Sequence, residues 1–177
     1  VLNAANVATE TLTVSGLNLI MASATQGTSG ALTFNNFDSL VGNGSESLNA
    51  GSLAVTLDRN SGGTSTVNGT VTMSGFETVT GSGALTATNL SAASLSGGNS
   101  TLSGSAGDVT VSTFATRNLT ALGSGSQTLT VSSLDVTLAS GSSTVGGNTT
   151  FSGFESLLGA GTETLNVNGL AVDLNMG

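Results

Sequence analysis

The chain has 177 residues, of which only 7% are charged, and its formal net charge is −8. With two basic residues in all, it cannot offer the clustered cations that bind nucleic-acid phosphates, so we expect no nucleic-acid partner. No apolar run approaches the ~20 residues of a membrane-spanning helix, and we expect no membrane insertion. Because 37% of the residues are apolar, disorder is the weaker interpretation, and a narrow aliphatic core is expected.

The elements predicted in chain order are short β-strands separated by glycine-rich corners. Leu12 and Val14 alternate with threonines, which is the period-two spacing of a half-buried strand. Strands are expected at 11–14, 17–21, 31–34, 37–41, 47–50, 53–57, 66–67 and 70–73, and corners at 26–30, 42–44 and 61–63. Gly and β-branched residues interrupt every window that could form a helix, so an all-β fold is predicted.

A repeated phrase organises the whole chain. Phe37, Phe76, Phe114 and Phe154 recur about every 39 residues, a period typical of stacked structural units. The copies cover approximately 1–33, 34–72, 73–110, 111–150 and 151–177. We therefore predict one parallel β-helix (a β-solenoid) over 1–177, with about 20 residues per coil and two coils per repeat.

The same residue types return at fixed places in these copies. The phenylalanines are expected to fill the core, the glycines to form corners, and the leucines to lie in the strands that follow. The structural repeat positions are Phe37, Phe76, Phe114, Phe154, Gly42, Gly81, Gly123, Gly159, Leu48, Leu129 and Leu165. The absence of proline fits strands that have a hydrogen-bonded neighbour on both sides.

One motif, Gly-x-Gly-x-Glu-x-Leu, occurs at 42–48 and at 159–165 and resembles half of the calcium-binding nonapeptide of RTX β-rolls. Calcium takes about six to eight oxygen ligands, whereas this motif offers one Glu per repeat and another copy carries Gln127 instead. We expect a glycine corner followed by a solvent-facing Glu, with no metal site and no cofactor.

An acid follows the repeated Phe in three copies, as Asp38, Glu77 and Glu155. The simplest interpretation is an outward-facing carboxylate beside a core Phe. A catalytic pair of carboxylates, as in enzymes that cleave polysaccharides, is the sharper alternative. The chain has no His, Lys, Tyr or Cys to act as base or nucleophile, so we expect no enzyme and no catalytic residues.

Pairs of threonines form a third pattern, at Thr11 and Thr13, at 70 and 72, and at 128 and 130. Threonine is a common outward strand residue. The alternative is a ligand-binding solenoid that uses Thr-rich faces for ice or carbohydrate.

The phrases FNNFDSLVGNGSESLNAGSL (34–53) and FSGFESLLGAGTETLNVNGL (151–170) resemble repeats of giant secreted bacterial surface adhesins of the filamentous-haemagglutinin-like kind. The resemblance implies a parallel β-helix stalk, secretion to the cell surface, and a role in adhesion or biofilm. It brings no catalytic residues.

The chain begins and ends in nearly the same phase of the repeat, with Glu10 and Glu163 at equivalent positions. Neither end carries the charged cap that a solenoid normally needs. We therefore expect a piece of a longer stalk, or a subunit that associates end to end into a filament, with glycans or cell surfaces as possible partners.

Overall fold

The computed structural model describes residues 1–5, 9–58, 62–90, 92–97, 100–104, 109–122 and 126–171. Within these ranges the chain forms strands and no helix, and so nothing there could cross a membrane as a helix. The strands are β1 (Leu2–Asn3), β2 (Thr11–Thr13), β3 (Leu19–Met21), β4 (Gln26–Ser29), β5 (Leu32–Asn35), β6 (Ser39–Asn49), β7 (Val55–Asp58), β8 (Ser65–Val67), β9 (Val71–Thr80), β10 (Ala84–Thr88), β11 (Ala92–Ser96), β12 (Leu102–Gly104), β13 (Thr110–Ser112), β14 (Thr116–Thr120), β15 (Thr128–Ser132), β16 (Val136–Leu138), β17 (Ser143–Val145), β18 (Thr149–Ser152), β19 (Ser156–Gly159) and β20 (Leu165–Val167).

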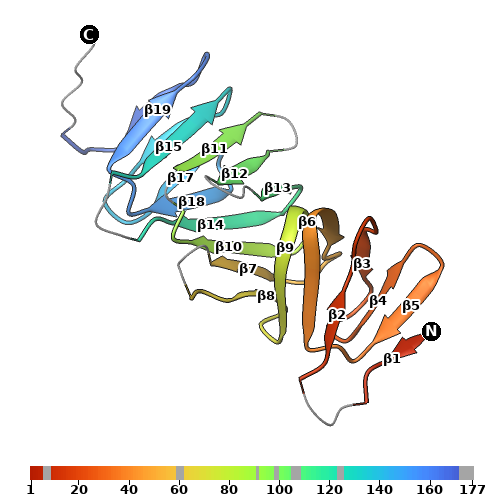
Figure 1. Cartoon of the computed structure of the whole chain (residues 1–177). Coiled ribbons are helices and arrows are strands. Elements are labelled where there is room, and N and C mark those ends of the chain that lie inside the picture. The colour runs from red at the N-terminus through yellow and green to blue at the C-terminus, as the bar shows by residue number, and fades with distance from the viewer. Residues whose placement is uncertain are drawn as a thin grey trace.

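The strands stack along one axis as two hydrogen-bonded ladders that share a core (Figure 1). Ladder I has the order β2–β6–β9–β8–β7–β10–β14–β18–β17–β16–β20. Ladder II has the order β1–β5–β4–β3–β6–β9–β13–β12–β11–β15–β19. The long strands β6 and β9 contribute to both ladders, and the register between them shifts where β6 passes from one to the other, between Val41 and Ser47.

Most neighbours in both ladders are parallel, as the sequence predicts for a β-solenoid, and the column makes about five turns. Four strands, β4, β8, β12 and β17, run antiparallel to both of their neighbours. Each of them lies between two strands that flank it in sequence. The chain therefore folds back on itself once in each repeat and then continues in the original direction.

The predicted coil length is wrong. Residues paired in register between neighbouring turns lie 28 to 36 positions apart in the sequence, not about 20. Each such span already contains an inverted strand, and a repeat of about 39 residues is longer than one such turn and shorter than two. The prediction failed because the segment around Gly27 reads as a corner, whereas it is strand β4. Gly27 lies opposite Phe34, and a Cβ there would lie 2.8 Å from the Phe34 Cε1 atom, so this glycine makes room for a ring instead of a turn.

Successive repeats exchange ladders. The strand residues that lead into the repeated Phe belong to β5 in ladder II, to the first part of β9 in ladder I, to β13 in ladder II and to β18 in ladder I. Equivalent side chains thus reach the core alternately from its two sides. The alternation explains why residues one repeat apart in sequence are not neighbours in the ladders.

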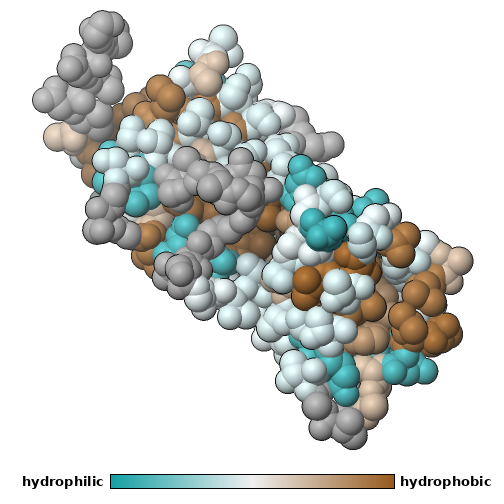
Figure 2. Space-filling model, viewed as in Figure 1, coloured by the Kyte–Doolittle hydropathy of each residue, from teal (hydrophilic) through white to brown (hydrophobic). Residues whose placement is uncertain are grey.

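The core between the ladders is narrow and aliphatic. Leu40, Leu85 and Leu119 come from ladder I, and Leu48 and Leu129 come from ladder II; all five are fully buried or nearly so. Burial of one such side chain contributes about 1.5–3 kcal/mol. Small hydroxyl residues alternate with them and face outward, so most of the visible surface is pale, with hydrophobic patches toward both ends of the column (Figure 2).

Candidate functional site

The four repeated phenylalanines belong to the core. Phe76 and Phe114 are buried, while Phe37 and Phe154 are half-buried and pack against the core. Phe37 and Phe154 each meet a second ring edge-to-face, with centroids 6.4 Å apart, at Phe34 and Phe151 respectively. These rings help to hold the two ladders together, and Phe154 also lines an open hollow together with Phe151 and Thr150.

The residue before each of these phenylalanines has a left-handed backbone, with φ of 62°, 71°, 68° and 76° at Asn36, Gly75, Thr113 and Gly153. Such a φ suits Gly and Asn but is strained for a β-branched residue. At Gly75 and Gly153 a Cβ would also collide with the backbone of Gly42 and Ala121 in the turn before. The two Ser-Gly-Phe copies therefore use glycine for both space and conformation.

The glycine–glutamate motif forms a corner tied by a carboxylate. Glu46 is 1% exposed, so the prediction of a solvent-facing Glu is wrong for this copy. Its Oε1 accepts the N–H of Gly16 at 2.7 Å, and its Oε2 accepts the N–H groups of Asn43 and Ser45 at 2.5 and 3.2 Å. The N–H of Gly16, together with those of Asn43 and Ser45, outweighs burial and lowers the Glu46 pKa to about 2. The carboxylate therefore links two turns directly through backbone N–H groups.

A second copy of this corner lies near the C-terminal end. Glu163 accepts the N–H of Ser133, 30 residues earlier, at 2.6 Å, and the N–H of Gly161 at 2.9 Å. The Ser133 contact is the main cause of a lowered Glu163 pKa. In the copy that carries Gln127, the side-chain oxygen is buried without a hydrogen-bond partner. A Glu carboxylate at this corner thus accepts backbone N–H groups of two turns, whereas the Gln127 side-chain oxygen accepts none.

The glycines of the motif leave room for these side chains. A Cβ on Gly42 would lie 3.2 Å from Glu46 Oε2, and one on Gly159 would lie 2.8 Å from Glu163 Oε2. Gly81, whose copy lacks the Glu, would place its Cβ 2.9 Å from the Phe114 ring instead. Gly123 lies outside the described residues. Among the repeated leucines, Leu48 and Leu129 are fully buried, whereas Leu165 in the last described turn is 38% exposed.

The acids beside the repeated Phe lie at the surface and bind backbone. Asp38 accepts the N–H of Glu10 at 3.1 Å, and Glu155 accepts the N–H of Gln127 at 2.8 Å, each across 28 residues. Within the described residues, no three acidic side chains come together as a metal cluster. Both carboxylates therefore link one turn to the next.

Arg117 is the basic residue whose placement the structure describes, and it lies inside the column. It occupies the position of Leu85 in the neighbouring strand and is 5% exposed. Its Nη1 donates to Thr149 Oγ1 at 3.2 Å and its Nη2 to the carbonyl of Ser100 at 3.4 Å. Burial lowers the pKa of this guanidinium. The spacing of two residues from the buried Leu119 is the sequence signal for this inward position, but a charged residue there reads as an outward one.

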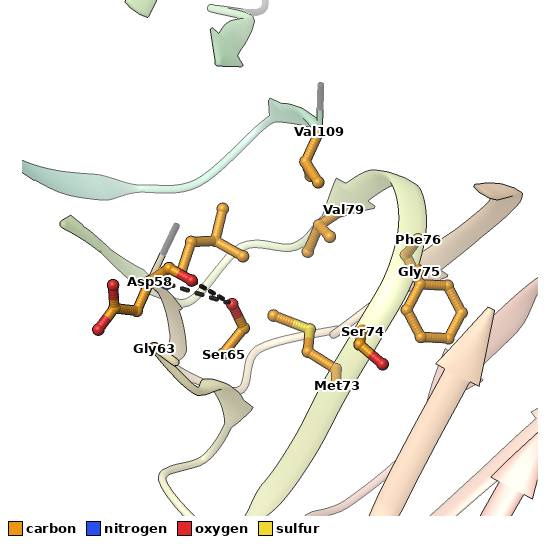
Figure 3. A pocket seen from close by; sticks show the side chains of 10 residues that line it. Asp58, Gly63, Ser65, Met73, Ser74, Gly75, Phe76, Val79 and Val109 are labelled. Atoms are coloured by element: carbon orange, nitrogen blue, oxygen red, sulfur yellow. Dashed lines mark hydrogen bonds between the residues drawn. The ribbon is translucent and has the colours of Figure 1, made fainter. Parts of the chain in front are cut away.

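A hollow of about 190 Å³ opens beside β7, β8 and β9 (Figure 3). Its floor is apolar, with Met73, Phe76 and Val79, and its polar groups are Asp58 and Ser65. Ser65 Oγ accepts the Asp58 N–H at 3.2 Å, and Asp58 Oδ1 accepts from Asn89 Nδ2 at 2.7 Å. The hollow is smaller than the roughly 300 Å³ at which ligand pockets begin, and its acid and hydroxyl are already bonded to neighbours. It does not form a catalytic constellation.

The threonines form an order that their spacing in sequence hides. One outward residue from each strand of ladder I is paired in register with the next, and we call this set the Thr row. Its members are Thr11, Ser39, Thr72, Thr66, Thr56, Thr86, Asn118, Thr150, Thr144, Thr137 and Asn166. The inverted strands β8 and β17 bring Thr66 and Thr144 into line with residues of other repeats. The row therefore crosses the whole ladder.

Comparison of the chain with protein-family models, curated proteins and solved structures found no match. The assignment of a function rests on the column, its corners and its surfaces.

Proposed function

We propose that this chain is a segment of an extracellular stalk or filament that serves cell adhesion or biofilm. The support is the way the repeats use their distinctive residues. Phenylalanines fill the core, Glu46 and Glu163 tie corners, and Asp38 and Glu155 link turns. Each of these groups stabilises the column itself, as expected of a protein that acts as a spacer. The resemblance to adhesin repeats adds the cell-surface location to this proposal.

The single observation that carries the proposal is the state of the ladder ends. Among the described strands, β1 and β2 at one end and β19 and β20 at the other are each paired on one side only. Exposed apolar side chains lie near both ends, with Val1 and Leu2 at one and Leu158 and Leu165 at the other. Open strand edges pair with further strands.

The partner that fits such an end is another turn of the same kind. The segment 163–170, ETLNVNGL, matches 10–17, ETLTVSGL, and β2 already pairs in parallel with β6 through Leu12 and Leu40. A following turn laid on β20 in the same manner would continue ladder I and bury Leu165. In this proposal that turn belongs either to a longer chain or to a second copy that associates end to end.

Immunogold electron microscopy of cells that produce the protein tests the proposal. An antibody against the chain is expected to label fibres that project from the cell surface. Label confined to the cell interior, or to isolated particles in the medium, would overturn the stalk assignment.

The end-to-end version has its own measurement. Sedimentation of the purified chain is expected to show association that grows with concentration and is reduced by Leu158→Lys, with Thr86→Lys on the side of the column as the matched control. A chain that stays monomeric at high concentration would refute association between copies and leave only the longer-chain version.

A further inference from the structure

We infer that the Thr row of ladder I is an ice-binding surface. This inference does not depend on the stalk proposal, because it concerns the side of the column and not its ends or its cellular location. Its basis is a set of register pairs that places a small, uncharged, hydrogen-bonding side chain on every strand of ladder I.

The spacing of the row is fixed by the backbone. Neighbouring strands lie ~4.8 Å apart, and outward residues two positions along a strand lie ~6.8 Å apart. In the middle of the ladder the row gains a second line, because Thr88, Thr120 and Ser152 are also paired in register. Within each line, side chains hydrogen-bond across strands: Thr150 Oγ1 donates to the amide oxygen Oδ1 of Asn118 at 3.3 Å, and Ser152 Oγ donates to Thr120 Oγ1 at 3.5 Å. The result is a two-dimensional lattice.

The lattice is rigid before any partner arrives. Thr56, Thr86 and Thr150 are half-buried between neighbours on both sides, while the residues next to Thr86, Leu85 and Ala87, point into the core and are buried. Threonine also has few χ1 rotamers, so little side-chain freedom remains to be lost on binding. A preorganised lattice of hydroxyl and methyl groups suits a partner that is itself periodic.

The side chains of the Thr row favour an uncharged ligand. The row contains no charged side chain; Asp58 lies in the adjacent line on one side, and the exposed Asp135 lies two positions before Thr137 on the other. Ions and charged polymers therefore have no counter-charge on the row to bind. Sugars usually stack on Trp or Tyr, which this chain lacks, and its phenylalanines are buried or half-buried against the core. The faces of ice repeat at a spacing close to that between strands and offer hydrogen bonds with hollows for methyl groups. Ice is thus the partner that the lattice fits.

The test is thermal hysteresis and ice affinity of the purified chain, measured with a nanolitre osmometer and with fluorescently labelled protein. The unmodified chain is expected to shape growing ice crystals, to lower the freezing point below the melting point, and to coat ice. Thr86→Lys and Thr150→Lys, in the middle of the row, should abolish this activity. Thr130→Lys, an outward substitution on ladder II, should retain it.

Circular dichroism identifies variants that have lost the fold, and Thr86→Val serves where a lysine is not tolerated. Val keeps the shape and the methyl group of Thr but replaces the hydroxyl with a second methyl group, so a measurable decrease in hysteresis is expected. Ice growth equal to that in buffer, or equal losses in Thr130→Lys and Thr86→Lys, would overturn the inference. So would binding of the unmodified chain to crystalline cellulose or chitin without binding to ice.

Discussion

The carboxylate of Glu46 accepts the backbone N–H of Gly16, which lies 30 residues earlier and one turn away, at 2.7 Å. The same carboxylate also holds its own corner through Asn43 and Ser45. One side chain therefore joins two turns at the place where strand β6 passes from ladder I to ladder II. A buried anion is costly unless several donors satisfy it, and here three backbone N–H groups do so.

This relationship predicts an acid-sensitive stability. The Glu46 pKa falls from its ordinary value of 4.5 to about 2 on folding. A depressed pKa contributes stability that is fully present above about pH 4.5 and is lost as the pH falls toward about 2. Glu46→Gln should lower the melting temperature at pH 7 and flatten its decline between pH 4.5 and 2. Thermal melts followed by circular dichroism across this range measure both effects.

Glu77→Gln is the matched control, because Glu77 is an exposed acid on β9. Its melting curve at pH 7 should remain close to that of the unmodified chain. Equal declines with acid in the Glu46→Gln and unmodified proteins would contradict the assignment of this stability to the corner. Gln127 shows why Glu46→Gln should lower the stability: at the equivalent corner its amide oxygen is buried without a hydrogen-bond partner.

Two glycines with the same backbone angle separate strain from crowding. Gly69 and Gly75 both have φ of +71°, but a Cβ on Gly69 would meet nothing within 4 Å, whereas one on Gly75 would collide with the Gly42 carbonyl. Gly69→Ala should cost about 1–2 kcal/mol of unfolding free energy from the left-handed backbone alone. Gly75→Ala should cost about 1–3 kcal/mol more, because two turns must move apart. Urea denaturation of both variants compares them, and equal costs would show that the turns do not approach closely at Gly42.

The sequence predicts the fold class, but it does not predict the coil length or the direction of each strand. The repeat of Phe37, Phe76, Phe114 and Phe154, the alternation of strand residues and the lack of proline lead to an all-β solenoid. The coil length could not be predicted from the sequence, because the segment around Gly27 has the composition typical of a corner, whereas its conformation is that of a strand. Hydrophobic periodicity shows where a strand is but not whether it runs up or down the ladder.

The candidate surfaces were hidden for the same reason. The Thr row joins residues from different repeats through the inverted strands β8 and β17, so no fixed spacing in the sequence marks it. Glu46 also reads as an ordinary polar residue after a glycine corner. Only the return of the chain beside Gly16 shows that its carboxylate has donors to bind.

The repeated leucines should differ in stability according to their place in the column. Leu48 lies between turns and is fully buried, while its counterpart Leu165 is 38% exposed in the last described turn. Leu48→Ala should lower the unfolding free energy by about 2–5 kcal/mol, through lost burial and a cavity. Leu165→Ala should cost about 1 kcal/mol or less, since less area leaves contact with protein. Denaturant titrations measure both, and a large cost for Leu165→Ala in the isolated chain would mean that another turn covers it.

Thr113 offers a substitution that should stabilise the column. It has φ of 68°, in the position that Asn36 and two glycines occupy in other repeats, and it is the one β-branched residue among the four. Its hydroxyl donates to the carbonyl of Gly81 in the preceding turn at 3.0 Å, which offsets part of the strain. Asparagine tolerates the left-handed region better and carries an amide donor that can replace the hydroxyl. Thr113→Asn should therefore raise the unfolding free energy by about 1 kcal/mol.

The same change at Thr72, in the regular part of β9, should be neutral or destabilising, because asparagine is disfavoured in strands. Differential scanning fluorimetry of the two variants decides the matter, and a lower melting temperature for Thr113→Asn would show that the hydrogen bond to Gly81 outweighs the backbone strain.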